Sequence, residues 1–173
     1  MRLFPNQRGF TLIEFIVVII VLGILMLGGV FGLRQVVDGY GLARDNSAST
    51  QKVQNALDRM VIELSHITSN NTGTRYNVSA GTAGSISYTA NFGGADENHT
   101  IDQSGSLVRM DSDNALILTD QVTANGLQLS YMDGNGNAVN ATDTSMRMIG
   151  IALTVQVIPG VTRTFNARVA LQR

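Results

Sequence analysis

Cysteine and tryptophan are absent from the 173-residue sequence, and charged residues are scarce at 14%, against about 25% in typical soluble domains. The lack of cysteine excludes a disulfide framework, a thiolate nucleophile and thiolate-ligated metal sites. Lys52 is the one lysine and the formal net charge is −1. Since no basic cluster stands out, we expect no nucleic-acid partner.

Motifs for catalysis or cofactor binding are also missing. The two histidines, His66 and His99, have no neighbouring residues at metal-ligand spacing, and Ser65 and His66 are adjacent, so on a helix they point apart. The sequence contains no G-x-S-x-G, P-loop or H-E-x-x-H pattern. We therefore predict a protein that is not an enzyme, with no catalytic residue, no cofactor and no metal.

One polar segment copies the beginning of a calcium-binding EF-hand loop. Asp133, Asn135 and Asn137 occupy its first three ligand positions, but the sixth position is Ala138 rather than glycine and the twelfth is Thr144 rather than glutamate. The segment is more typical of a polar turn than of a cation site.

What the sequence does have is a long apolar run. Residues 15–33 are nineteen residues without a charge, which span about 28 Å as a helix, close to the hydrocarbon thickness of a bilayer. A helix buried inside a soluble core is the plain alternative, but a chain of this length rarely buries a helix on all faces. A cleaved secretory signal would need small residues at A-x-A-like positions after the run, and Gly28-Gly29 is a poor match.

The residues before the run are polar and basic. Arg2 and Arg8 predict that the amino terminus lies in the cytoplasm and that the chain after Leu33 lies outside. We expect a single-pass protein of the bacterial inner membrane with a periplasmic or extracellular carboxy-terminal region.

The segment R-G-F-T-L-I-E, residues 8–14, followed by the apolar run, resembles the class III leader of type IV pilins and type II secretion pseudopilins. The resemblance implies that prepilin peptidase removes residues 1–9 by cutting after Gly9, and that the new first residue, Phe10, is N-methylated. It also implies that residues 10–33 are kept, first as a transmembrane segment and then as the helix through which subunits assemble.

Glu14 is the one acidic residue beside the apolar run, and a carboxylate inside hydrocarbon is costly. It could stay hydrated near the membrane surface, because it lies only about 6 Å along a helix from Phe10 and near the positive end of the helix dipole. The resemblance implies a second role, in which Glu14 pairs with the amino terminus of a neighbouring subunit and sets the axial register.

Gly28 and Gly32 form a small-xxx-small pair that would permit close helix contact, although glycine is also common in transmembrane helices generally. Beyond the span, residues 34–69 are predicted to continue the helix in amphipathic form. Apolar residues recur there at three- and four-residue spacing: Val53, Ala56, Leu57, Met60, Val61, Leu64 and Ile67. This face is expected to pack on a carboxy-terminal sheet.

Residues 70–173 are predicted to form a β-rich region outside the membrane. The expected strands are 85–92, 100–102, 106–110, 115–122, 126–132, 146–158 and 161–171, with the last two joined across Pro159-Gly160. A long helix followed by strands predicts an α+β fold with one antiparallel sheet, as in type IV pilins.

The carboxy-terminal half carries a weaker resemblance to J-type minor pseudopilins and W-type minor pilins. It rests on the stretches 106–111, 126–136, 146–157 and 162–173, and on Arg59–Leu64. Many family members have a proline where Phe31 stands. Major pilins usually have a carboxy-terminal cysteine pair, and major pseudopilins have a calcium-binding loop. These features are not evident in the sequence, which favours a minor subunit at or near the tip.

The sequence thus predicts a minor pilin or pseudopilin that assembles into a type IV pilus or a type II secretion pseudopilus. The partners implied are prepilin peptidase, other pilin or pseudopilin subunits, the inner-membrane assembly platform and membrane lipid. The alternative is a single-span, membrane-anchored module that acts outside a filament, in cell adhesion or in recognition of DNA or another ligand. The sequence does not separate a pilus from a protein secretion system, because both use the same leader and helix.

Overall fold

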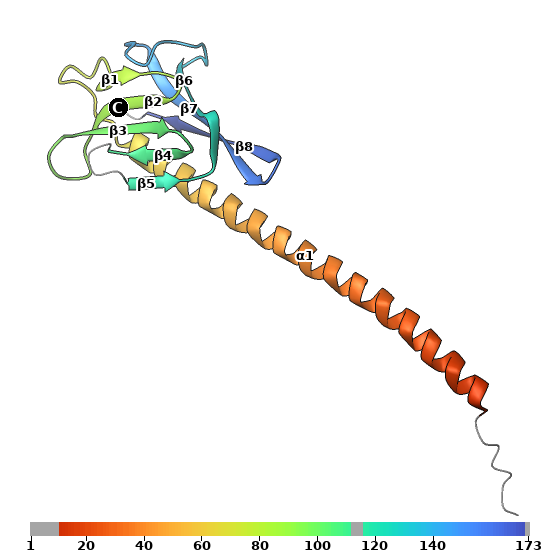
Figure 1. Ribbon diagram of the computed structural model, residues 1–173. Helices are drawn as coiled ribbons and strands as arrows, with labels where there is room; N and C mark the ends of the chain where they lie inside the picture. Colours follow the sequence, from red (N-terminus) through yellow and green to blue (C-terminus); the bar gives the residue numbers. More distant parts are fainter. Residues whose placement is uncertain (1–10, 112–115, 172–173) are drawn as a thin grey trace, which may run out of the picture. The chain divides into compact units, whose positions relative to one another are not determined.

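The computed structural model describes residues 11–111 and 116–171. One helix, α1 (Leu12–Ser65), is followed by eight strands. The strands are β1 (Val78–Gly81), β2 (Ser85–Ala90), β3 (Glu97–Ser104), β4 (Leu107–Met110), β5 (Leu116–Thr119), β6 (Val122–Asp133), β7 (Met146–Ile158) and β8 (Val161–Ala170). The chain divides into two compact units, residues 1–44 and 45–173, and the last turns of α1 belong to the second unit with all the strands. Figure 1 shows this order along the chain.

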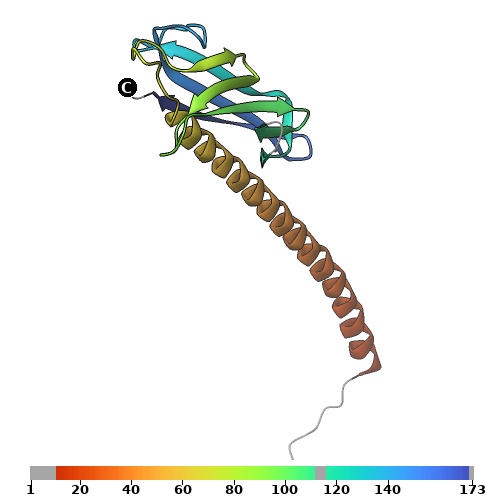
Figure 2. The same cartoon turned by 90° about the vertical axis from the view of Figure 1, so that its left-hand side faces the viewer.

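The strands form two antiparallel sheets. The first has the order β1-β2-β3-β4-β5 and the second the order β6-β7-β8. Figure 2 shows strands of both sheets beside the last turns of α1. The prediction of an α+β fold, with a long amino-terminal helix packed on antiparallel strands, is confirmed. One antiparallel sheet was predicted, however, and the strands form two.

Side chains tie the two sheets together. Gln103 on β3 donates from Nε2 to the carbonyl oxygen of Thr123 (2.8 Å), and its Oε1 accepts the backbone N–H of Leu127 on β6 (2.8 Å). The hydroxyl of Tyr131 on β6 donates to the carbonyl oxygen of Thr82 beside the first sheet (3.1 Å). These bonds satisfy backbone groups where the ladder does not continue from one sheet to the next.

The core of the second unit lies between the last turns of α1 and the strands. The helix contributes the buried residues Val53, Ala56, Leu57, Met60 and Leu64, five of the seven positions that the apolar spacing predicted. Ile67 is buried as well, at 5% exposure, but Val61 is only partly buried. Each strand of the β6–β8 sheet adds alternating apolar residues, which is the period of two expected where one face covers a core.

The helix ends earlier than predicted. Its last residue is Ser65 rather than residue 69, because side chains take the place of the next backbone donors: Ser65 Oγ donates to the carbonyl oxygen of Ile62 (2.7 Å), and His66 Nδ1 lies 2.8 Å from the same oxygen. Ile67 then pairs in extended form with Ala90. Residues 66–69 therefore belong with the strands.

Several strand predictions need correction. The predicted strands 100–102 and 126–132 are parts of the longer β3 and β6. Residues 115–122 were expected to form one strand, but Ala115 lies outside the described residues, β5 stops at Thr119 and β6 starts at Val122. The break falls at Gln121, whose φ of +62° lies in the left-handed region and cannot continue a strand. Strand β1 was not predicted at all. The hairpin β7–β8 has the predicted bounds within one residue, and Gly160 at its turn has φ +80°, which glycine adopts readily after proline.

Candidate functional site: the amino-terminal helix

The first turn of α1 begins at Thr11, the first described residue. Its carbonyl oxygen accepts hydrogen bonds from the backbone nitrogens of Glu14 (3.1 Å) and Phe15 (3.3 Å). Thr11 therefore occupies the N-cap position, for which threonine is a favoured residue. The predicted cleavage residue Gly9 and methylation residue Phe10 lie outside the described residues.

Glu14 turns back toward this cap. Its Oε2 lies 3.4 Å from both the backbone nitrogen and the Oγ1 of Thr11. A glutamate at the third helical position that binds the N-cap nitrogen forms one half of a capping box, T-x-x-E. The signal for this arrangement is present in the sequence as Thr11-Leu12-Ile13-Glu14, although no cap was predicted there. In the described chain Glu14 is exposed and serves its own helix.

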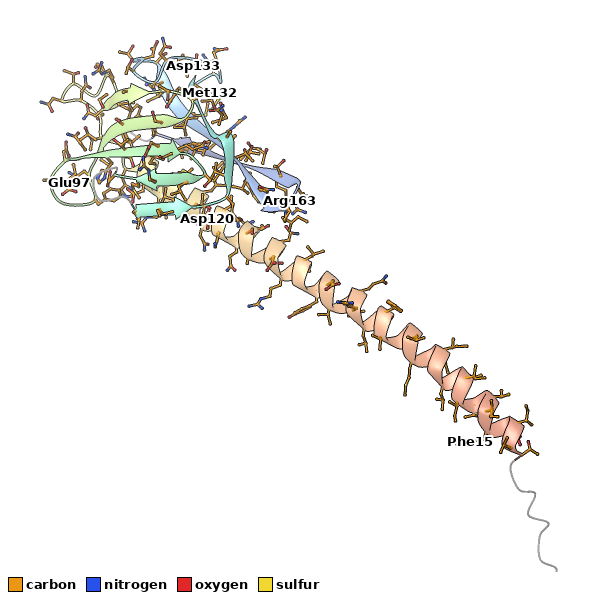
Figure 3. The ribbon with its side chains drawn as sticks, viewed as in Figure 1. Phe15, Glu97, Asp120, Met132, Asp133 and Arg163 are labelled. Atoms are coloured by element: carbon orange, nitrogen blue, oxygen red, sulfur yellow. The ribbon has the colours of Figure 1, made fainter. Side chains whose placement is uncertain are left out.

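The apolar run is not covered by the rest of the described chain. Every residue from 11 to 40 is exposed, including Leu12 at 80% and Phe31 at 66%, and Figure 3 shows side chains around the helix from Phe15 onward. The segment is long and apolar enough to cross a membrane, and none of its most apolar stretch is buried. Large apolar surfaces of this kind are covered by lipid or by other protein.

The glycines of the run leave room beside the helix. A Cβ built on Gly28 or Gly32 would meet no atom within 4 Å, and the same is true at Gly23 and Gly29. Nothing within the described chain therefore requires glycine at these positions. The pair Gly28 and Gly32 thus offers a flat strip at which another helix could approach closely.

The other polar candidates serve the fold of the second unit. The Asp133 carboxylate accepts the backbone N–H groups of Asn135 (2.8 Å) and Asn137 (2.8 Å), and the side-chain amide of Asn137 donates to it as well (2.9 Å). The hydrogen bond from the Asn137 side chain, followed by those from the backbone, holds the pKa of Asp133 below its usual range. This segment is a turn closed by an aspartate, as predicted.

The two histidines lie close to one aromatic residue. His66 packs on Phe92 with ring centroids 4.7 Å apart, and His99, 5.9 Å from Phe92, has its Nδ1 2.9 Å from Oδ2 of Asp111. The prediction that Ser65 and His66 point apart is wrong, because Oγ of Ser65 lies 3.2 Å from Nδ1 of His66 where the helix ends. Among residues 11–111 and 116–171, no group of three or more histidine, aspartate or glutamate side chains is arranged to hold a metal ion.

Comparison with known protein families identifies the start of the chain. Residues 4–30 match the prokaryotic N-terminal methylation motif. Comparisons with curated proteins and with solved structures give no significant match. The match supports a class III leader of the type IV pilin kind, which implies processing by prepilin peptidase and assembly with other pilin-like subunits. A single apolar helix after that leader fits membrane anchoring, and its packing on antiparallel strands matches the type IV pilin-like architecture.

Proposed function

We propose that this protein is a structural subunit of a type IV pilus or type II secretion pseudopilus, and that it performs no chemistry of its own. The observation that carries the proposal is the position of the methylation motif, residues 4–30, over the start of a helix whose apolar side chains between residues 11 and 40 are all exposed. A helix that only anchored a domain would need the apolar length but not the motif. A helix that assembles with the helices of other pilin-like subunits uses both the apolar length and the motif.

The subunit is proposed to pass through two stages, membrane insertion with processing and then assembly into a filament. The precursor is inserted with its amino terminus in the cytoplasm, and prepilin peptidase then removes residues 1–9 and methylates Phe10. Residues 10–33 first cross the inner membrane and then, through the assembly platform, leave lipid for the core of a filament. The exposed apolar side chains of α1 support this exchange, because neighbouring helices can cover the same surface that lipid covers.

Glu14 is proposed to change partners between these stages. In the described chain its carboxylate binds the Thr11 nitrogen and hydroxyl. Cleavage would create a cationic amine at Phe10, four residues earlier, and a carboxylate taken from water into a helical core requires a positive partner. We propose that the amine of a neighbouring subunit supplies that charge and thereby fixes the axial position of one helix against the next.

The subunit is proposed to be a minor one, at or near the tip. Support comes from Phe31, which stands where many members of the pilin family have proline, and from the absence of cysteine. The Asp133 turn, which in sequence most resembles a calcium loop, has its carboxylate engaged by its own backbone. These features match the weaker resemblance to J-type and W-type subunits.

Site-specific cross-linking distinguishes this proposal from a solitary membrane-anchored receptor. A photoreactive residue is placed in the full-length protein at Leu22, Leu25 or Ile24, in cells that express the other subunits. A filament subunit should form cross-links to pilin-like proteins from these positions. Cross-links to lipid alone, in cells that are assembling filaments, would support the anchored receptor instead.

A further inference from the structure

Strand β8 forms an open edge of the second sheet. It follows β7 in the order β6-β7-β8 and pairs with no other strand within residues 11–111 and 116–171. Nine of its ten residues keep a regular register, from Met148↔Ala170 to Gln156↔Thr162, and the register shifts only next to the turn, between Gln156 and Ile158. Proteins usually protect such an edge with a short strand, a bulge, a lysine or a proline, and residues 161–170 contain neither lysine nor proline.

The other edges are protected. Strands β1 and β5 have four residues each, and the pairing of each contains a register shift. The outer edge of β6 is used by other backbone: Leu129 N–H donates to the carbonyl oxygen of Ala83 (2.7 Å), and Tyr131 accepts from Val139 N–H (2.9 Å). No such bond reaches the outer edge of β8 from residues 11–111 or 116–171.

The register shows which residues of β8 face this open edge. Leu171 N–H donates to the carbonyl oxygen of Arg147 (2.9 Å), so these two residues form a hydrogen-bonded pair. Such pairs alternate along an antiparallel ladder, and therefore residues 163, 165, 167 and 169 bond to β7. The backbone N–H and C=O groups of Thr164, Asn166 and Arg168 point outward to the open edge.

The same three residues direct their side chains to the outer face of the sheet. Val169, of opposite parity, is buried in the core at 3% exposure. On the outer face a hollow of about 400 Å³ lies over Gly150 and Ala152, between Met132 and Arg168. Figure 3 labels Met132 at one end of this sheet and Arg163 near the β7–β8 turn. Neither Arg163 nor Arg168 forms an ion pair with the described residues.

We propose that the open edge of β8 binds an extended, acidic segment of another protein by strand addition, with a carboxylate of that segment beside Arg168. Backbone hydrogen bonds to Thr164, Asn166 and Arg168 would supply affinity, and side-chain charge would supply selectivity. Charge favours this partner over a second copy of the chain, because residues 161–170 carry two arginines and no acid, so that two β8 strands would bring four arginines together. The interaction uses no residue of the assembly helix and does not depend on the function proposed above.

The test uses the full-length protein in detergent and a fluorescent peptide of alternating valine and glutamate. Two comparison peptides have lysine in place of glutamate, or N-methyl groups on the amides of one edge. The acidic peptide should bind, and the N-methylated one should bind about tenfold more weakly or worse, because it cannot donate to the edge. Equal binding of the two, or no binding of the acidic peptide, would overturn the proposal.

Matched variants locate the site. Thr164→Pro removes one outward N–H and should weaken binding, whereas Thr164→Ala keeps that N–H and should bind normally. Arg168→Glu should shift the preference from the glutamate peptide to the lysine peptide, and Arg163→Glu, on the opposite face, should not. Because the chain has no cysteine, Asn166→Cys reports directly on a second copy. Rapid formation of a disulfide-linked dimer in that variant would identify another copy as the occupant and contradict the acidic partner.

Discussion

Glu14 caps the first turn of α1 by binding Thr11, since Oε2 of Glu14 lies 3.4 Å from both the backbone nitrogen and the hydroxyl oxygen of Thr11. The carboxylate that looks out of place in an apolar segment therefore has a local role as a helix cap. That role does not require a charge, because glutamine serves at the same position of a capping box. The proposed pairing with an amine in the filament does require a charge. Replacing Glu14 by glutamine therefore distinguishes the capping role from the filament role.

The first prediction concerns that charge. Glu14→Gln should leave membrane insertion and helix capping intact, but it should reduce incorporation into filaments, because the neutral amide cannot compensate a buried amine. Incorporation is measured by blotting sheared filaments against the membrane fraction. Thr11→Ala is the matched control, since it removes the cap hydroxyl and keeps the charge. Equal incorporation of the Glu14→Gln variant and the unmodified protein would contradict the proposed charge pair.

The second prediction concerns close helix contact. Gly32→Leu should insert into the membrane and raise helix propensity, yet assemble poorly, because the added side chain fills the strip beside Gly28. Gly23→Leu is the control, because it lies nine residues away, on the opposite side of the helix. Cross-linking yield between subunits is the measurement. If both variants assemble equally well, the Gly28 and Gly32 strip is not a contact.

The third prediction concerns stability of the second unit. The buried Tyr76 hydroxyl donates to the carbonyl oxygen of Leu171 at 2.9 Å and so ties residues 95 positions apart. Tyr76→Phe leaves that oxygen without this donor and should lower the free energy of unfolding by about 0.5–1.5 kcal/mol. Denaturant unfolding measures the change. Tyr40→Phe, at a tyrosine that is 74% exposed, should change stability by less than about 0.5 kcal/mol.

The fourth prediction concerns pH. The pKa of Asp133 is lowered by the Asn137 amide and by backbone N–H groups, so the carboxylate favours the folded turn. Its contribution is present above the pKa of an unfolded aspartate, about 3.9, and is lost as the pH falls through the folded-state pKa. Asn137→Ala should move the pKa of Asp133 upward, which carboxyl NMR titration would detect. An unchanged pKa in that variant would show that the side-chain bond is not the cause.

Much of this architecture could be predicted from the sequence, because its signals are local. The β7–β8 hairpin alternates regularly on both sides of Pro159-Gly160, and its predicted bounds agree with the structure. The amphipathic part of α1 was identified from spacing alone. The helix end was placed too late because the competing bonds to the Ile62 carbonyl come from side chains, which apolar spacing does not register.

The remaining features depend on distant contacts. Strand β1 has four residues, two of them exposed, and its pairing is irregular, so its alternation is too short to read. The break between the two sheets falls at Gln121, whose left-handed backbone an apolar pattern does not signal. Gln103 then joins the sheets through Thr123 and Leu127, which lie 20 and 24 positions away in the sequence. The cap at Glu14 follows the local pattern T-x-x-E, but the same carboxylate also fits a role in assembly, so the pattern alone does not assign it.

The central claim is that the apolar helix is a processed assembly segment and not a simple anchor. Mass spectrometry of the amino-terminal peptide, from protein purified out of cells with an active prepilin peptidase, tests it most directly. The account predicts a peptide that begins at Phe10 and carries one methyl group on its amine. A peptide that retains residues 1–9, or one that begins beyond Leu33, would contradict it.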